Sequence, residues 1–370
     1  MENKNKKIPW WEPQIGSPLE RELIEQVLVD NYANEGKLTA RFETEIAALL
    51  GVKYAVATTS GTSAIFLALK ASGVGLGDEV IVPDATFIAT ANAVSLCGAT
   101  PILVDIDPRT LTISIEALKK AITPKTKAIV PVHVTGRGAD MESILAIANE
   151  HGLVVVEDAA EAFFSKHQGK YLGTLGDAGC FSFSAAKTIT TGQGGMIVTN
   201  SDELYMKLKP LKDQGRPVRG TGGDDLHDTI GFNFKFTDIQ AALGLGQLRL
   251  LAERTERMKH IYILYRESLR GISGFSVFDI DISGGGVPQW TDIIVERRNE
   301  LDAYLKEDNI DCRRYWLPIH RQRAYLLPDD HFPNSTKLLT QALWLPSAFT
   351  LSDEDVVFVT DRIKEFFSKH

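Results

Sequence analysis

The chain has 370 residues, of which 44% are hydrophobic and 24% are charged. This mix is typical of a globular protein long enough for one large domain or two packed domains. The formal net charge is −8 with both signs scattered along the chain, whereas a nucleic-acid-binding protein is expected to carry a basic stripe. No apolar signal-peptide core follows the polar stretch Met1–Lys7, and no run of about 18 apolar residues predicts a membrane span. We therefore expect a cytoplasmic protein that binds neither nucleic acid nor membrane.

Short β-branched runs alternate with helix-length segments up to about residue 250. Nearly continuous apolar strands separated by helices are typical of a mostly parallel sheet that is covered on both faces. The last two runs lie close together, which is compatible with one antiparallel strand. The expected strands of this seven-stranded sheet are Tyr54–Thr59, Glu79–Pro83, Pro101–Asp105, Ala128–Val132, Leu153–Glu157, Gly179–Ser184 and Gly195–Thr199, and the helices are Thr62–Ala71, Ala89–Leu96, Ser114–Ala121 and Met141–His151.

The last third of the chain reads as a separate unit. A long amphipathic stretch, Asp238–Leu269, leads away from the sheet, and the glycine-rich break Ser283–Gly286 follows it. We expect an α/β protein with an N-terminal arm at 1–20, a large domain at 21–250 and a smaller α+β domain at 251–370. The expected elements after the break are the strands Thr291–Val295 and Asp311–Trp316 and the helices Arg298–Asp308 and Ser352–Phe367.

The cysteines carry no chemistry of their own. Cys97, Cys180 and Cys312 lie far apart, and no two of them form a Cys-x-x-Cys pair. An odd number at such spacing argues against a disulfide framework or a structural zinc site. We expect buried free thiols and no metal.

Two motifs fall at the carboxyl ends of expected strands, where open α/β sheets bind ligands. Thr59–Ser63 is a hydroxyl-rich turn before a helix, so its N–H groups and the helix dipole favour a phosphate, although it also suits a plain N-cap. Asp158 ends an apolar strand and needs a cationic or donor partner. A protonated pyridine nitrogen is one such partner, and a helix cap or a core ion pair are the alternatives.

A third motif, Phe181–Gly195, contains a single lysine, Lys187, among small residues before a glycine-rich turn. A lysine attacks an aldehyde only as the neutral amine, which desolvation or a nearby cation makes accessible. Lys187 alone would be read as an ordinary solvated charge. The order and spacing of the three motifs together favour a cofactor site.

At these residues the chain resembles the DegT/DnrJ/StrS family of sugar aminotransferases, which depend on pyridoxal 5′-phosphate (PLP) and share the fold type I architecture. The likeness extends from about Pro13 to the terminal helix. Within the family the chain looks nearest to enzymes of the perosamine-synthase type. The resemblance rests on Gly61-Thr62, Gly77–Pro83, Glu157–Ala162, Phe181–Phe183, Lys187 and Gly231–Phe234.

The resemblance implies a role for each motif. Lys187 holds PLP as a Schiff base and moves protons, and Asp158 keeps the pyridine nitrogen protonated. Phe87 matches the aromatic residue that stacks on the ring, with a core phenylalanine as the alternative. Glu161 lies near the phenolic oxygen, where a carboxylate has to be protonated or bridged by water. The phosphate cup is expected to comprise Gly61, Thr62 and Ser182.

The resemblance also implies a homodimer with shared active sites, because Asn233 matches a residue that reaches the phosphate of the neighbouring subunit. Lys235 replaces an arginine of many relatives and loses its planar fork. Substrate contacts are expected from the segments Asn31–Gly36 and Trp316–His320, in particular from Tyr32, Asn34 and His320, with a structural histidine as the alternative for the last. Arg216 and Arg219 either contact a nucleotide diphosphate or lie in solvent.

The implied reaction transfers an amino group from L-glutamate to a nucleotide-linked keto-deoxysugar, with a 4-keto-6-deoxyhexose favoured, for a polysaccharide such as a lipopolysaccharide O-antigen. Transamination of a cyclitol ketone is an alternative. A sugar 3-dehydratase is disfavoured because the pattern of those enzymes has histidine where this chain has Lys187. The presence of Lys187, Asp158 and the cup residues argues against a catalytically silent relative.

Overall fold

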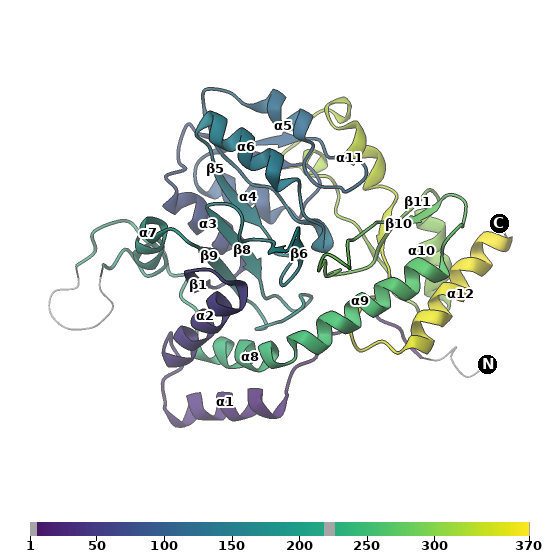
Figure 1. The fold of residues 1–370 in the computed structure, drawn as a ribbon, viewed down its shortest axis with the longest axis horizontal. Helices are drawn as coiled ribbons and strands as arrows, with labels where there is room; N and C mark the ends of the chain where they lie inside the picture. The colour runs from purple at the N-terminus through teal and green to yellow at the C-terminus, as the bar shows by residue number, and fades with distance from the viewer. Residues whose placement is uncertain (1–5, 218–225, 370) are drawn as a thin grey trace.

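The computed structural model describes residues 6–217 and 226–369 (Figure 1). Its largest sheet has seven strands in the order β1-β9-β8-β5-β4-β2-β3. Strand β9 runs antiparallel to both of its neighbours, whereas the pairs from β8 to β3 are parallel. The mostly parallel sheet predicted from the sequence is thereby confirmed. The strands are β1 (Tyr54–Thr58), β2 (Glu79–Pro83), β3 (Thr100–Val104), β4 (Thr126–Ile129), β5 (Val154–Asp158), β8 (Ala178–Ser182) and β9 (Gly195–Thr199).

Helices cover both faces of this sheet. Alternate strand residues point to opposite faces, and Val80 and Ile81 are accordingly buried in two different apolar cores. Helices α3, α4 and α7 pack on one face. On the other face, α1, α2 and α8 cover the end at β1, and α5 and α6 cover the end at β3. These helices are α1 (Pro18–Val29), α2 (Lys37–Leu50), α3 (Gly61–Ala71), α4 (Ala89–Leu96), α5 (Ile115–Ala121), α6 (Met141–His151), α7 (Asp202–Lys212) and α8 (Asp238–Arg249).

A second, antiparallel sheet has the order β10-β11-β13-β12. Helices α9, α10 and α12 enclose a separate apolar core with it. In Figure 1, α8 and α9 follow one another from below the large sheet towards this second unit. The elements are α9 (Leu251–Ser268), β10 (Phe275–Val277), β11 (Asp292–Val295), α10 (Arg298–Glu307), β12 (Arg313–Arg314), α11 (Pro333–Leu338), β13 (Ala342–Trp344) and α12 (Asp353–Lys369), and the hairpin β6 (Lys166–His167) with β7 (Lys170–Tyr171) belongs to neither sheet.

The second unit differs in detail from the sequence prediction. The amphipathic stretch Asp238–Leu269 forms two helices that meet at Leu250, whose ψ of −3° departs from helical geometry. The expected strand Asp311–Trp316 shrinks to β12, because the backbone N–H of Asp311 bonds to Ile8 of the N-terminal segment instead. Strands β10 and β13 were not expected. Domain boundaries at 20 and 250 stay predictions.

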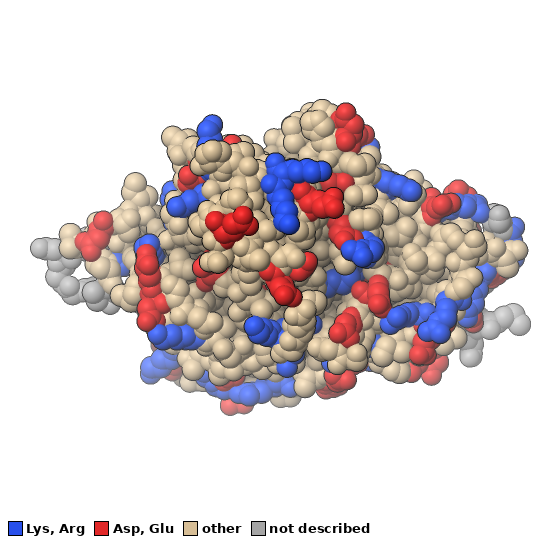
Figure 2. Space-filling model, turned by 45° about the horizontal axis from the view of Figure 1, so that its top comes forward, with Lys and Arg blue, Asp and Glu red and all other residues tan. Residues whose placement is uncertain are grey.

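Lysine, arginine, aspartate and glutamate side chains are intermixed on the face shown in Figure 2. No helix in the described ranges is long and apolar enough to cross a membrane. Cys97 and Cys180 are free and buried as expected, whereas the free thiol of Cys312 is half-buried.

Candidate active site

A cavity of about 320 Å³ opens at the carboxyl end of the large sheet, where β1, β5 and β8 end and β9 begins. The single antiparallel strand is the reason why the loop between β8 and β9 lies at this edge. Seven of the residues that the sequence predicts for the cofactor site line the cavity, together with aromatic residues of the second unit. They are Gly61, Thr62, Phe87, Asp158, Glu161, Ser182 and Lys187.

The amino end of α3 forms one wall. Ser60 and Ser63 cap the helix reciprocally, with N–H···Oγ distances of 3.0 and 3.1 Å. The N–H groups of Gly61 and Thr62 therefore have no acceptor within the helix and are available to an anion. A Cβ atom on Gly61 would lie 3.0 Å from Cβ of Ser182, so glycine lets the two cup residues approach each other. This wall suits a phosphate.

Asp158 is the last residue of β5 and is buried. Its Oδ2 accepts a hydrogen bond of 2.7 Å from the hydroxyl of Thr90, and its Oδ1 accepts one of 3.1 Å from the N–H of Ala160. Burial raises the pKa of Asp158, and these two donors oppose the shift. Among the described residues no cation forms an ion pair with this carboxylate, so a protonated nitrogen would be a favourable partner.

Lys187 lies in the loop after β8, with 13% of its side chain exposed. Its Nζ is 3.4 Å from Oε1 of Glu161 and 4.9 Å from the ring centre of Trp290. Burial raises the pKa of Glu161, whereas Lys187 lowers it. The amine therefore lies in a partly desolvated place between a carboxyl group and an indole ring.

The loop that contains Thr135 contacts the second carboxyl oxygen of Glu161 and is fixed to the second unit. The N–H of Thr135 bonds to Oε2 of Glu161 at 3.3 Å, and its hydroxyl bonds to Asp292 at 3.1 Å. Arg137 binds the same Asp292 with two bonds of 2.7 and 2.8 Å. Thr135 has a φ of 49°, which non-glycine residues seldom adopt. A buried bidentate ion pair thus joins the cavity loop to β11 of the second unit.

Tryptophan residues cover the side of the cavity away from the large sheet. Trp290, Trp316 and Trp344 line it, and the rings of Trp290 and Trp344 lie 4.8 Å apart. Phe87, which is 53% exposed, lines the cavity just before α4 and is accessible for stacking on a flat ring.

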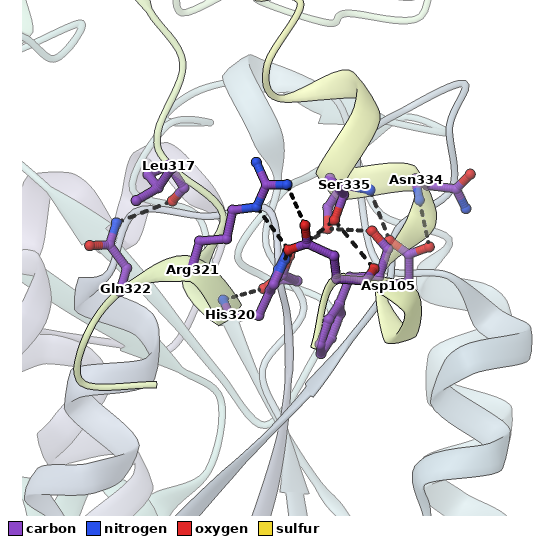
Figure 3. A network of polar contacts seen from close by, with 11 residues as sticks. Asp105, Leu317, His320, Arg321, Gln322, Asn334 and Ser335 are labelled. Atoms are coloured by element: carbon purple, nitrogen blue, oxygen red, sulfur yellow. Dashed lines mark hydrogen bonds and ion pairs between the residues drawn. The ribbon is translucent and has the colours of Figure 1, made fainter. Parts of the chain in front are cut away.

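His320 lies outside the cavity lining, in a network of polar contacts (Figure 3). The ring is fully buried and packs 4.5 Å from Phe332. Its Nδ1 is 2.7 Å from Oδ2 of Asp84, and its Nε2 is 3.0 Å from Oδ1 of Asp329. Both ring nitrogens are therefore engaged within the protein, an arrangement that favours the structural alternative. The network attaches the segment from Leu317 to Ser335 to the end of β2.

Three further predicted residues also lie outside the cavity of their own chain. Tyr32, Asn34 and Asn233 are exposed. Hydrogen bonds and an ion pair place their segments side by side. The backbone oxygen of Asn34 accepts a bond from the N–H of Asp238. The side chain of Lys212 pairs with Glu35, and the backbone carbonyl of Lys212 accepts a bond from the N–H of Phe234. Arg216 is not among the cavity residues. Arg219 lies outside the described residues.

Three observations show that the cavity fits PLP. The amino end of α3 offers unpaired N–H groups to a phosphate. The buried carboxylate of Asp158 suits a protonated ring nitrogen, and the amine of Lys187 opens into the same cavity as Phe87. No group of three or more metal-ligating side chains lies together in the described part of the chain.

The sequence prediction missed several cavity residues. Thr90, the second residue of α4, donates to Asp158 and lies three residues after Phe87, so a hydroxyl residue at this helix start was a usable signal. Trp290 and Arg313 lie in no recognisable motif. They reach the cavity only because the second unit folds over it.

Comparisons with known proteins agree with this geometry. A family model, the DegT/DnrJ/EryC1/StrS aminotransferase family, matches residues 15–364. GDP-perosamine synthase of Escherichia coli O157:H7 is 38% identical over 98% of this chain and 99% of its own length. GDP-perosamine synthase of Caulobacter vibrioides is 47% identical over 87% of this chain and 88% of its own. The solved structure of DesV from S. venezuelae, in complex with a ketimine intermediate, superposes with a TM-score of 0.89 at 33% identity and covers 94% of both chains.

These matches confirm the expected fold type I architecture, the enzyme class and the cofactor. They extend over both units of the chain, from before α1 into α12. The chain therefore belongs to the DegT/DnrJ/EryC1/StrS family of PLP-dependent aminotransferases, which includes sugar aminotransferases.

Proposed function

We propose that this aminotransferase moves the amino group of L-glutamate to a nucleotide-linked keto-deoxysugar, with a 4-keto-6-deoxyhexose as the favoured acceptor. The observation that carries the proposal is the meeting of Lys187, Asp158 and the amino end of α3 in one cavity. The GDP-perosamine synthases among the relatives support the nucleotide-linked sugar. The product would be an amino sugar for a surface polysaccharide, made in the cytoplasm.

Each cavity residue has a distinct task in this proposal. PLP, when bound, supplies an aldehyde that links to amines and a ring that withdraws electrons from the adjacent carbon. Lys187 would hold the aldehyde and carry a proton to and from the reacting carbon, because it is the one lysine among the described residues that line the cavity. Asp158 would keep a proton on the ring nitrogen, and Gly61, Thr62 and Ser182 would hold the phosphate.

Lys187→Ala is the first test. Wild-type protein loaded with PLP should be yellow, and borohydride followed by peptide mass spectrometry should find the cofactor attached to Lys187. The variant should lose this attachment, and its aminotransferase activity should fall by about a thousandfold or more, since it lacks the proton carrier. Lys207→Ala, which changes a half-exposed lysine on α7 outside the cavity lining, should keep the attachment. A colourless wild-type protein would overturn the proposal.

The acceptor is tested separately. GDP-, UDP- and dTDP-linked keto-sugars, together with a keto-cyclitol, would each be incubated with the enzyme and L-glutamate, and products identified by mass and NMR. We expect amination of a GDP-linked 4-keto-6-deoxyhexose, in line with the relatives. Preferential amination of the keto-cyclitol would favour the cyclitol alternative instead.

We also propose a homodimer in which each active site receives residues from both subunits. Tyr32, Asn34 and Asn233 are exposed and lie outside the cavity of their own chain, where a neighbouring subunit could use them. Large apolar side chains near them in sequence are exposed as well, with Val29 at 77% and Ile230 at 85%. Exposed apolar residues of this kind favour an interface between subunits.

A further inference from the structure

Arg313 is a cavity residue to which neither the sequence motifs nor the proposed chemistry assigns a task. It belongs to β12 and lines the same cavity as Lys187. Its guanidinium carbon lies 4.8 Å from the ring centre of Trp10 and 5.5 Å from that of Trp344. Cation–π contacts of this kind hold the planar group at the side of the cavity that the second unit provides, without using its N–H donors.

The neighbouring Arg314 shows the contrast. Its Nε donates a 2.9 Å hydrogen bond to Oδ2 of Asp302, so its charge is paired within the protein. Successive residues of a strand point to opposite sides, which directs the two guanidinium groups to different surroundings. The backbone of Arg313 pairs with Trp344, but its guanidinium group forms no hydrogen bond or ion pair with any described residue, although it has five N–H donors. An available cation therefore faces the cavity.

The charges around the cavity make this cation distinctive. The charged residues that line it are Asp158, Glu161, Lys187 and Arg313. The first two are acidic, and the amine of Lys187 is committed to the cofactor in the proposed function. Within the described lining, Arg313 is thus the one positive group left for an anionic substrate.

We propose that Arg313 is the residue that recognises the anionic group of the substrates, a carboxylate of the amino donor or the diphosphate of the nucleotide sugar. The inference rests on the proposed function, in which both substrates carry such a group and occupy the cavity in turn. A guanidinium group binds two oxygens of a carboxylate or phosphate with parallel hydrogen bonds. The aromatic rings beneath it position this fork before the substrate arrives, so less side-chain entropy is lost on binding.

The test measures binding rather than turnover. PLP-loaded full-length protein would be titrated calorimetrically with 2-oxoglutarate and, separately, with GDP. Arg313→Gln should weaken the binding of at least one probe by about tenfold or more, because a charge-assisted bidentate contact is lost. Arg313→Lys should lie between this variant and the wild type, since it keeps the charge without the fork. Arg314→Gln is the matched control and should bind both probes like the wild type.

The outcomes separate the sources of the anion. Weaker binding of 2-oxoglutarate alone assigns Arg313 to the donor carboxylate, and weaker binding of GDP alone assigns it to the diphosphate. Added guanidinium ion should partly restore binding to Arg313→Gln, which a merely structural defect would not allow. If Arg313→Gln keeps the yellow colour and binds both probes like the wild type, the inference is wrong while the proposed function stands. A colourless wild-type protein would instead refute the proposed function.

Discussion

Two opposing effects act on the carboxyl group of Glu161. Burial raises its pKa, and the nearby Lys187 amine lowers it, with burial the larger effect. The direction of this shift favours a protonated carboxyl group. A protonated Glu161 can donate a hydrogen bond to a phenolic oxygen as glutamine does, which removes the like-charge conflict that an ionised carboxylate would create there.

The shift predicts how stability depends on pH. A carboxyl group whose pKa is higher in the folded chain contributes stability below its unfolded value, near 4.5, and loses it as pH rises through the folded value. In cofactor-free protein, Glu161→Gln should therefore melt a few degrees above wild type at neutral pH, and the difference should shrink towards pH 4.5. Thermal melts over this range measure the effect. Glu203→Gln, which changes an exposed glutamate, should show no such trend.

At the scale of secondary-structure elements, the antiparallel strand β9 supports the amino end of α3. Gly195 begins β9 and pairs with Thr58 on one side and Ser182 on the other. A Cβ atom at this position would overlap the carbonyl oxygen of Ser60 and lie 2.8 Å from the nitrogen of Gly61. The contact atoms belong to the backbone, so they cannot move aside without shifting the helix.

Gly195→Ala should therefore weaken PLP binding by about tenfold or more, equivalent to at least about 1.4 kcal/mol. The expected cause is a displaced phosphate wall, so the change should appear in titrations of cofactor-free protein followed by absorbance. Gly75→Ala is a suitable control, because a Cβ atom there meets nothing within 4 Å. Equal PLP affinity in the two variants would contradict this account.

The buried residue Asp84 connects β2 to the 3-10 helix Ile319–Arg321, and its backbone oxygen accepts a bond of 3.1 Å from Ile319. Asp84 accepts bonds from the backbone and the ring of His320, at 2.7 Å each, and from the hydroxyl of Ser335. It lies three residues before Phe87, so this contact also steadies the cavity wall. We expect the network of Figure 3 to support the fold.

His320→Ala should reduce the free energy of unfolding by about 1.5–3 kcal/mol, because the buried carboxylate of Asp84 loses the hydrogen bond from the ring of His320. Urea denaturation measures this loss. Asp329→Asn, at the exposed end of the network, should cost much less. The opposite pattern, an unchanged stability with a higher KM for the sugar, would return His320 to the substrate contacts predicted from the sequence.

Helices and strands whose ends carry clear stop signals could be predicted from the sequence. The bounds of β2, β9, α4 and α6 agree with the prediction, since apolar runs of strand or helix length end there in glycine, proline or a capping residue. Three-residue strands such as β10 and β13 carry too little periodicity to be recognised. The cofactor-facing motifs were found because each lies on one strand end, whereas the Trp290 and Arg313 wall depends on contacts between distant segments.

For the whole molecule, the arrangement of exposed residues predicts complementation between subunits. Lys187→Ala and Asn233→Ala should each be nearly inactive alone, because one lacks the amine and the other the proposed contribution to the neighbouring site. After mixing and subunit exchange, half of the dimers would be mixed and would hold one intact site each, giving about one quarter of wild-type activity. Assays of the exchanged mixture measure this recovery.

The control for complementation is a mixture of Lys187→Ala with Asp158→Ala. Both changes affect residues that line the cavity of their own chain. Each site of a mixed dimer then carries one of the two defects, and no activity should return. Recovery equal to that of the first mixture would argue against sites built from both chains.

The N-terminal segment has a consequence for the order in which the enzyme assembles on the ribosome. Ile8 pairs with Ile310, the N–H of Ser347 bonds to the carbonyl of Trp10, and Lys6 bonds to Asp355, which is 349 positions away. Contacts of such sequence separation form slowly and only after both partners have been synthesised. The large sheet can be complete well before then, so the tryptophan-lined wall and the contacts of Arg313 with Trp10 and Trp344 should form last. Nascent chains should therefore complete the cofactor-facing wall before the wall proposed to select a substrate.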